Sequence, residues 1–280
     1  MIQSIYYVIK YRPSLVVSFG SYVSVPILIS AKIFHIKIYS HIQTIQPGIS
    51  DKIALKYSDK IFISWKETEK YIKKKKKIIY TGNILRNEIF VNNTNYFNFN
   101  NNDKILYITG GNQGSHIINN TILKSIELLL TEYNIVHQIG TNSVYNDFNK
   151  SIKIKNNLPY NLKDKYIIEQ NIWGDRVGEI LNKSDLIIGR SGANTVYEIL
   201  ALNKKAIFIP LLKGAKNDQI YNAKVAKKYS NNIEILNENE LNYDNLKNKI
   251  DEILSKKFSK NYKIPLNGKE IISNLINNNI

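Results

Sequence analysis

The sequence contains no cysteine. Disulfide bonds, thiolate metal sites and a cysteine nucleophile are therefore excluded, and the absence fits a reducing compartment. Acidic residues are also scarce, because 23 Asp and Glu stand against 39 Lys and Arg, which gives a formal net charge of +16. Such a surface favours anionic partners: phosphorylated ligands, acidic lipid or nucleic acid. A biased genome composition would produce the same excess, since Lys, Asn, Ile and Tyr are all abundant.

Metal-binding patterns and long apolar runs are missing as well. No Asp-x-Asp pair occurs, and no His, Asp or Glu cluster has metal spacing, so we expect no metal, no cofactor and no metal-dependent sugar transferase. The most apolar stretch, Val23 to Ile38, is interrupted by Lys32, His35 and Lys37, and it falls short of the roughly 20 apolar residues of a spanning helix. The opening residues show no signal-peptide pattern. We expect a soluble chain that touches a membrane surface.

What the sequence does contain is a series of short β-branched runs, each almost continuously apolar. They occupy residues 15–20, 36–41, 60–65, 77–82, 104–110, 133–140, 165–170, 185–190 and 205–210. Such runs are typical of strands buried on both faces. Helical patterns lie between many of them; in residues 115–133, Ile118, Ile122, Ile126 and Leu129 form one stripe. Strands alternating with helices predict parallel sheets with right-handed crossovers.

An Asn-rich segment divides the chain. Residues 91–103 have little to bury and read as a linker, which predicts an N-terminal domain over 1–90 and a second domain over 104–262. Residues 263–280 are expected to form a helix that packs back on the first domain. A lysine run, 73–77, is either a solvated loop or a contact for anionic lipid headgroups.

Two of the predicted strands end in glycine-bearing turns that open helices. In "YITGGNQGSHIIN" (107–119), Gly110 and Gly111 permit a sharp turn, and the helix beginning near Ser115 directs free N–H groups at it. The spacing is neither GxGxxG nor a P-loop. An anion site and a plain tight turn are both compatible with this pattern.

The second turn has the same form. Ser191, Gly192 and Ala193 follow the strand 185–190, and a helix starts at about Asn194. Parallel sheets bind ligands at this carboxyl end of their strands. Glu198, one turn into the helix, suits the two hydroxyls of a ribose, or it simply favours the positive end of the helix. Two such turns in one half of the chain favour a phosphate-bearing ligand.

A third polar cluster follows the strand 205–210. Asp218, Gln219 and Asn222 stand at the start of a helix, where they suit sugar hydroxyls or act as ordinary caps. The four histidines are scattered, and His41 alone ends a strand where a polar side chain would face a cleft.

These segments, in this order and spacing, resemble the MurG family of GT-B-fold glycosyltransferases. The resemblance rests on "TGGNQGSHIIN", "GRSGANTVYEILALNKKAIFIP" and "NDQIYNA", together with "SFGSYVSVP" (18–26) and "TGNILR" (81–86). It implies an α/β chain of two Rossmann-like parallel-sheet domains. The implied activity is inverting, metal-independent transfer of N-acetylglucosamine from UDP-N-acetylglucosamine to undecaprenyl-pyrophosphoryl-muramyl-pentapeptide. This places the chain in peptidoglycan synthesis, and hence in cell shape and division, at the cytoplasmic face of a bacterial membrane.

The resemblance also implies site residues. Glu198 would bind the ribose; Ala193, Asn194, Thr195 and Gln219 would contact the donor sugar and phosphates; Ile172 would read the uracil. The remaining donor-binding residues implied by the motifs are Arg86, Gly111, Asn112, Gln113, Gly114, Ser191 and Gly192. Tyr22, His41, Gln43 and Thr44 fall on the acceptor side, where the family's His-Glu-Gln-Asn segment reads His-Ile-Gln-Thr.

The family's opening strand and Gly-Gly-His loop, which carry the presumed catalytic base, have no counterpart in this sequence. We therefore expect an incomplete N-terminal domain and name no catalytic residue. The chain is then truncated, completed by a separate N-terminal subunit, or a donor-binding remnant. A related UDP-sugar transferase with another lipid acceptor is a further alternative. Nucleic acid is not an expected partner, because the aromatic residues do not interleave with the basic ones.

Overall fold

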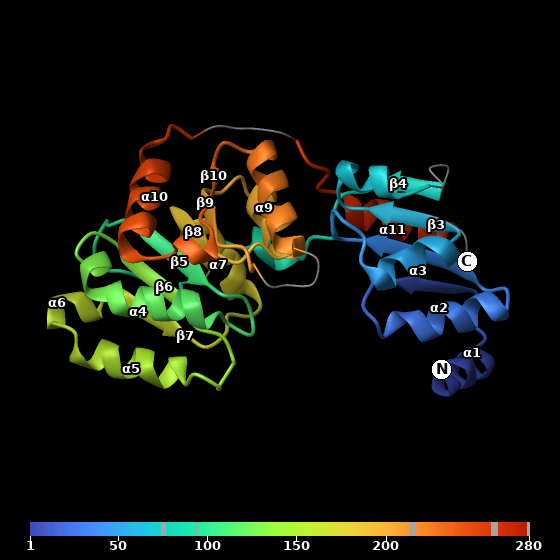
Figure 1. Ribbon diagram of the computed structural model, residues 1–280, viewed down its shortest axis with the longest axis horizontal. Coiled ribbons are helices and arrows are strands. Elements are labelled where there is room, and N and C mark those ends of the chain that lie inside the picture. Colours follow the sequence, from blue (N-terminus) through green and yellow to red (C-terminus); the bar gives the residue numbers. More distant parts are fainter. Residues whose placement is uncertain (74–76, 93–94, 213–216, 259–262, 279–280) are drawn as a thin grey trace. The chain divides into compact units, whose positions relative to one another are not determined.

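The computed structural model describes residues 1–73, 77–92, 95–212, 217–258 and 263–278. It divides into two compact units (Figure 1). Unit 1 comprises residues 1–85 and 263–280, and unit 2 comprises residues 86–262. Within the described ranges, no helix has both the length and the apolar character that crossing a membrane requires. Lys74, Lys75 and Lys76 of the lysine run lie outside those ranges.

Unit 1 is built on a four-stranded parallel sheet of order β1-β2-β3-β4. Its strands are β1 (Leu15–Ser18), β2 (Lys37–Ile42), β3 (Lys60–Ile63) and β4 (Ile78–Tyr80). Its helices are α1 (Ile2–Tyr11), α2 (Ser24–Ile33), α3 (Ile49–Tyr57), the 3-10 helix η1 (Lys66–Tyr71) and α11 (Gly268–Asn277). The strands follow one another across the sheet in the order of the sequence.

Both faces of the unit 1 sheet are covered. Ile38 and Ile61 point to one face, where they pack with Leu28 of α2. Their chain neighbours Tyr39 and Phe62 point to the other face and pack with Ile272 of α11. Successive residues of a strand alternate between faces, so strands that bury both faces need unbroken apolar runs. This explains why the strands are visible in the sequence.

Unit 2 contains a six-stranded parallel sheet of order β10-β9-β8-β5-β6-β7. The strands are β5 (Ile105–Thr109), β6 (Asn134–Gln138), β7 (Tyr166–Glu169), β8 (Leu186–Gly189), β9 (Ala206–Phe208) and β10 (Ile233–Ile235). The helices are η3 (Asn87–Phe90), α4 (His116–Leu130), α5 (Asp147–Asn157), α6 (Tyr160–Lys163), α7 (Asp175–Lys183), α8 (Ala193–Ala201), α9 (Asp218–Tyr229), η5 (Glu238–Glu240) and α10 (Tyr243–Ser255). Counted from β7, the order is 3-2-1-4-5-6, the doubly wound Rossmann arrangement.

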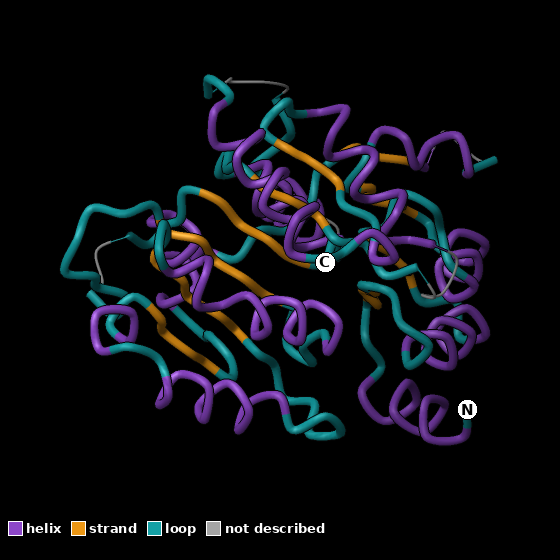
Figure 2. Tube along the Cα trace, turned by 60° about the vertical axis from the view of Figure 1, so that its left-hand side comes forward, coloured by secondary structure: helices purple, strands orange, loops and turns teal. Residues whose placement is uncertain are grey.

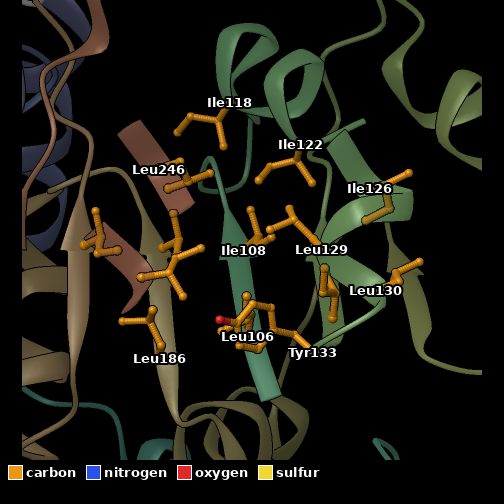
Figure 3. Packing of buried hydrophobic residues seen from close by; sticks show 14 of the residues in the cluster. Leu106, Ile108, Ile118, Ile122, Ile126, Leu129, Leu130, Tyr133, Leu186 and Leu246 are labelled. Carbon is orange, nitrogen blue, oxygen red and sulfur yellow. The ribbon is translucent and has the colours of Figure 1, made fainter. Parts of the chain in front are cut away.

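The main core of unit 2 lies between the sheet and α4. Figure 3 shows Ile118, Ile122 and Leu129 of α4 on the side of Ile108 of β5, and Leu246 of α10 belongs to the same cluster. The predicted stripe is confirmed, since all four of its residues are buried: Ile118, Ile122, Ile126 and Leu129. Helices flank the strands of the sheet, as Figure 2 shows. The predicted parallel α/β fold is therefore confirmed in both units.

The structure adds one strand and reassigns one segment. All nine predicted strands are present, and β10 is an additional strand of three residues. Part of the Asn-rich stretch, expected as a linker, lies within unit 2, because the buried carboxylate of Glu179 accepts the backbone N–H groups of Tyr96 (3.0 Å) and Phe97 (2.9 Å). The Phe97 ring is itself buried.

Candidate functional site

A cavity of about 250 Å³ lies in unit 2 at the carboxyl ends of β5 and β8. These two strands are neighbours, and the strand order reverses between them. Helices leaving adjacent strands at such a point go to opposite faces of the sheet, which leaves a crevice for a ligand. The lining residues are Arg86, Tyr107, Thr109, Gly110, Gly111, Asn112, Gln138, Ile172, Val177, Leu181, Ile187, Arg190, Gly192, Thr195, Glu198 and Gln219.

Two helices begin at this cavity, and neither is capped by a side chain. Ser115 is the N-cap residue of α4 and Gly192 is that of α8, and in both cases no cap hydrogen bond is made. The first N–H groups of a helix have no partner inside the helix, and the helix dipole adds positive potential there. Together these two helix starts favour an anionic group such as a diphosphate.

The first glycine turn is held from below by the loop that follows β6. Gly114 (φ +81°) and Gly140 (φ +92°) pack backbone to backbone, and a Cβ atom on Gly114 would lie 2.0 Å from the carbonyl oxygen of Ile139. The N–H of Thr141 donates to the carbonyl of Asn112 (2.9 Å). A trans peptide points its C=O and N–H in opposite directions. Because the Asn112 carbonyl points to Thr141, the N–H of Gln113 points away from the loop that follows β6.

A buried polar chain continues beneath this loop. His116 Nδ1 lies 2.9 Å from Asp147 Oδ1, and Asn119 donates to the other Asp147 oxygen (3.1 Å). The Oδ1 atom of Asn119 lies 3.2 Å from His137 Nε2, and His137 Nδ1 lies 3.0 Å from the Tyr166 hydroxyl. Burial lowers the pKa of His137 to about 3, with the Asp147 charge opposing the shift. His137 is therefore a neutral structural residue.

Glu198 lies in the cavity wall, paired with Arg86. The guanidinium donates from Nε to Oε1 (2.8 Å) and from Nη2 to Oε2 (2.9 Å). Burial opposes the charge of Arg86, but the hydrogen bonds and the charge of Glu198 prevail, and the pKa of Arg86 is raised. Both carboxylate oxygens are thus directed toward one bidentate partner, the geometry that a ribose diol would also require.

The third polar cluster joins α8 to α9. The Ser191 hydroxyl donates to the backbone carbonyl of Gln219 (2.8 Å), and Asn222 donates back to the Ser191 carbonyl (3.1 Å). The Gln219 side chain accepts the N–H of Leu211 (3.1 Å), so its position at the cavity is fixed. Lys213 to Lys216 of the polar loop before α9 lie outside the described residues.

Tyr107, Gln138 and Arg190 line the cavity and were missed by the sequence analysis. The Tyr107 hydroxyl donates to Gln138 Oε1 (2.7 Å), and burial raises the pKa of Tyr107 to about 12. Both side chains belong to strands whose sequences read as core. The available signal was a polar residue ending each buried run, Gln138 in "NIVHQ" and Arg190 in "LIIGR".

Eight of the predicted donor-binding residues lie together around the cavity: Arg86, Gly111, Asn112, Ile172, Gly192, Thr195, Glu198 and Gln219. The other five are not among its lining residues: Gln113, Gly114, Ser191, Ala193 and Asn194. Gly114 packs against Gly140 and Ser191 donates to the Gln219 carbonyl, while Gln113 and Asn194 are exposed. All thirteen belong to unit 2.

The predicted acceptor-side residues belong to unit 1, where they have different environments. Tyr22 is 70% exposed, whereas His41 is buried. The Nε2 atom of His41 lies 3.1 Å from the Gly82 carbonyl and Nδ1 has no partner, so the expectation of an imidazole facing an open cleft is wrong. Burial lowers the pKa of His41, because β2 is covered on both sides. Gln43 and Thr44 lie half-buried after β2, and their carbonyls accept from Trp65 and Thr68.

Among the residues that the structure describes, no group of three or more His, Asp or Glu side chains could hold a metal ion.

Comparisons with known proteins identify the family of the chain. Residues 105–275 match the glycosyltransferase family 28 C-terminal domain, and residues 1–63 match the family 28 N-terminal domain. A relative from Clostridium botulinum (strain Alaska E43 / Type E3) is 35% identical over 274 residues, which cover 95% of this chain and 72% of the relative. It is named UDP-N-acetylglucosamine–N-acetylmuramyl-(pentapeptide) pyrophosphoryl-undecaprenol N-acetylglucosamine transferase.

Other relatives span the chain to a similar extent. One from Bacillus cereus (strain ATCC 14579), a transferase of the same name numbered 2, is 32% identical and covers 96% of this chain and 74% of its own length. The crystal structure of Acinetobacter baumannii MurG superposes with a TM-score of 0.72 at 18% identity, over 99% of this chain and 78% of that one. That likeness shows the GT-B fold. By sequence, the chain belongs to glycosyltransferase family 28 and within it to the MurG family.

Proposed function

We propose that unit 2 binds UDP-N-acetylglucosamine and that the chain transfers its N-acetylglucosamine to a lipid-linked muramyl-pentapeptide. The observation that carries the proposal is the 35% identity to a transferase so named, over 95% of this chain. The cavity supports it, because Glu198 suits a ribose diol and two uncapped helix starts suit a diphosphate. Ile172 would lie at the base, and Gln219 and Thr195, which also line the cavity, would lie at the sugar.

The proposed reaction is inverting. An acceptor hydroxyl would form a new bond to the anomeric carbon as the bond from that carbon to the diphosphate oxygen breaks and UDP leaves. The negative charge that develops on UDP would be stabilised by the N–H groups at the starts of α4 and α8, which makes a metal unnecessary. The acceptor hydroxyl must also lose a proton to a general base, which we leave unassigned.

A calorimetric titration with UDP-N-acetylglucosamine tests the donor site. Wild type should bind, and Glu198→Ala should lose about tenfold to a hundredfold in affinity, because charge-assisted hydrogen bonds contribute roughly 1.5–3 kcal/mol. Glu234→Gln is the matched control, since Glu234 is also buried in unit 2 and paired with Lys227 and Lys256, and it is not among the residues that line the cavity. Absence of binding by folded wild type would refute the proposal, and so would equal losses in the two variants.

Acceptor identity needs a second measurement. Transfer of labelled N-acetylglucosamine to the muramyl-pentapeptide lipid, compared with other undecaprenyl-linked sugars, would separate this reaction from that of a related transferase with another acceptor. Donor binding without turnover on any acceptor would support a donor-binding remnant. The chain spans between 62% and 74% of the length of the curated relatives that it matches, so the activity of the whole protein stays a proposal.

We further propose that unit 1 contacts an anionic membrane surface. The first 50 residues contain four Lys and Arg and no Asp or Glu. In α1, Tyr6, Tyr7 and Tyr11 are each more than half exposed, beside Lys10. Exposed aromatic residues beside basic ones are suited to the headgroup region of an acidic bilayer, which is consistent with a role at the cytoplasmic face of a bacterial membrane.

Co-sedimentation with vesicles tests this contact. The chain should bind phosphatidylglycerol-containing vesicles and not purely zwitterionic ones. A Tyr6→Ser/Tyr7→Ser variant should bind at least severalfold more weakly, because apolar area is lost from the contact. Tyr160→Ser is the control, since Tyr160 is exposed on unit 2. Undiminished binding by the double variant would rule out α1 as the contact.

We also propose that a separate polypeptide, one of the alternatives raised above, pairs with β1 of unit 1. Among the described strands β1 pairs only with β2, and its residues Leu15, Val16 and Val17 are half-buried. Open strand edges accept further strands. We propose that acceptor transfer depends on such pairing; full turnover by the purified chain alone would contradict this dependence.

A further inference from the structure

Arg190 lines the cavity and connects three of the segments around it. It follows β8 directly, and its side chain is only 12% exposed. Its Nη1 donates to the carbonyl of Ile209 after β9 (3.0 Å), and its Nη2 donates to the hydroxyl of Ser115 (2.7 Å) and to a carboxylate oxygen of Glu238. One guanidinium thus connects the start of α4, the end of β9 and the 3-10 helix η5.

The contact with Ser115 has a consequence for α4. Serine is a preferred N-cap residue because its hydroxyl accepts an N–H of the first turn. Here Ser115 makes no such cap, and its hydroxyl accepts from Arg190 instead. No side chain therefore caps the N–H groups at the start of α4, and this helix start lies beside Gly110, which lines the cavity.

The contact with Glu238 balances the charge. The second Glu238 oxygen also lies near the N–H of Leu212 (3.5 Å), so the carboxylate is held on the side of Arg190. This ion pair offsets the charge of the guanidinium. A diphosphate at the helix starts would be a second anion within the field of the same cation.

From this arrangement we propose that Arg190 is the positioning residue of the diphosphate subsite. It holds Ser115 away from its own helix, so that the N–H groups of α4 stay available, and it places a positive charge beneath the phosphates. Glu238 moderates that charge. The inference rests on the proposed donor function, and it predicts that Arg190 discriminates ligands by their number of phosphates.

Titration with uridine, UMP and UDP tests the inference. For Arg190→Met, the dissociation constant for UDP should rise about tenfold to a hundredfold, as for the loss of charge-assisted hydrogen bonds, while that for uridine should change less than about twofold. Arg190→Lys should be intermediate, because an ammonium keeps the charge without the planar fork. Glu238→Gln should bind UDP more tightly than wild type and leave uridine binding unchanged.

Arg176→Met is the matched control, because Arg176 also forms a half-buried ion pair in unit 2, with Glu169, outside the residues that line the cavity. It should not change the ratio of UDP to uridine affinity. Equal weakening of uridine and UDP by Arg190→Met, or by Arg190→Lys should the first variant not fold, would overturn the inference as a purely structural effect. If wild type binds neither ligand, the proposed donor function itself fails.

Discussion

The two sheets share parallel strands and buried faces, but they differ in how the strands are ordered. In unit 1 the four described strands follow the sequence across the sheet, so each crossover steps in the same direction. In unit 2 the order turns back at β5, and β8 is placed on its other side. The described cavity with its convergent polar groups lies at that reversal.

The reversal of strand order between β5 and β8, rather than the glycine motifs alone, creates the site in unit 2. At the reversal, the helices that follow β5 and β8 pack on opposite faces, so two helix starts border one opening. In unit 1 the strand end that carries His41 is instead filled by its own chain, through Gly82 and Ser64. Similar strands thus give an open site in one unit and a packed one in the other.

Gly114→Ala should have the largest effect, because it should disrupt the site in unit 2 and leave unit 1 intact. The added Cβ atom would lie 2.0 Å from the Ile139 carbonyl, at a residue with φ of +81°. We expect unit 2 to lose at least about 3 kcal/mol and the chain to lose UDP binding. Unit 1 should be unaffected, which thermal unfolding followed at the buried Trp65 in a Trp173→Phe background would show.

Gly111→Ala is the control for that experiment. Gly111 has nearly the same φ, +82°, but its Cβ atom would meet nothing within 4 Å. Only the left-handed backbone is penalised, at about 1 kcal/mol. Equal destabilisation by the two variants would mean that the packing of the turn against Gly140 contributes nothing.

Acid should lower the stability of unit 2 more than that of unit 1. The pKa of His137 in unit 2 is lowered to about 3 from an ordinary 6.5. Between these values the unfolded chain binds a proton that the folded unit does not, so stability falls as pH drops below 6.5, by about 1.4 kcal/mol per pH unit. In unit 1 burial also lowers the pKa of His41, but its hydrogen bond to Gly82 opposes the shift.

Urea unfolding of each unit between pH 7 and pH 4 measures this slope. His137→Gln should flatten the pH dependence of unit 2. His41→Gln should leave it unchanged, because His41 belongs to unit 1. A His137→Gln variant with the wild-type slope would show that other groups dominate acid unfolding.

The smallest expected effect is a gain in uridine affinity when Arg86 is replaced. Arg86 occupies the edge of Glu198 that a ribose diol would use, and a carboxylate offers only one such bidentate edge. Arg86→Met should therefore tighten uridine binding, by about threefold to tenfold, a range consistent with the roughly 1 kcal/mol of a half-exposed ion pair. Arg86→Lys should have a weaker effect. Calorimetry with uridine decides it, and weaker uridine binding by Arg86→Met would show that Arg86 assists rather than competes.

Much of the fold was predictable because both faces of each sheet are buried. Nine strands are nearly continuous apolar runs, and the stripe of α4 has the helical period. The strand β10 was missed because Glu234 interrupts its three residues, so no continuous apolar run marks it. The segment around Phe97 is held by Glu179, a contact across 82 residues that no local pattern reports.

The site was predictable to the extent that it is built from helix starts. Gly111 and Gly192 lie in turns and Glu198 lies one turn into α8, so the local sequence marks all three, and the structure places them at one cavity. Tyr107 and Arg190 were not predicted as site residues, because their positions at the cavity depend on which strands are neighbours in the sheet. The pairing of β5 with β8 brings them together, although they lie far apart in sequence.

Unit 1 is assembled from two stretches of chain, with all of unit 2 between them. A ribosome that adds about 5–20 residues per second therefore needs roughly 10–40 s to pass from residue 86 to the end of α11. Throughout that interval Tyr39 and Phe62 lack the helix that covers them. Unit 2 is contiguous in sequence, so it should complete its fold before unit 1, whose sheet stays exposed on one face until α11 has been synthesised.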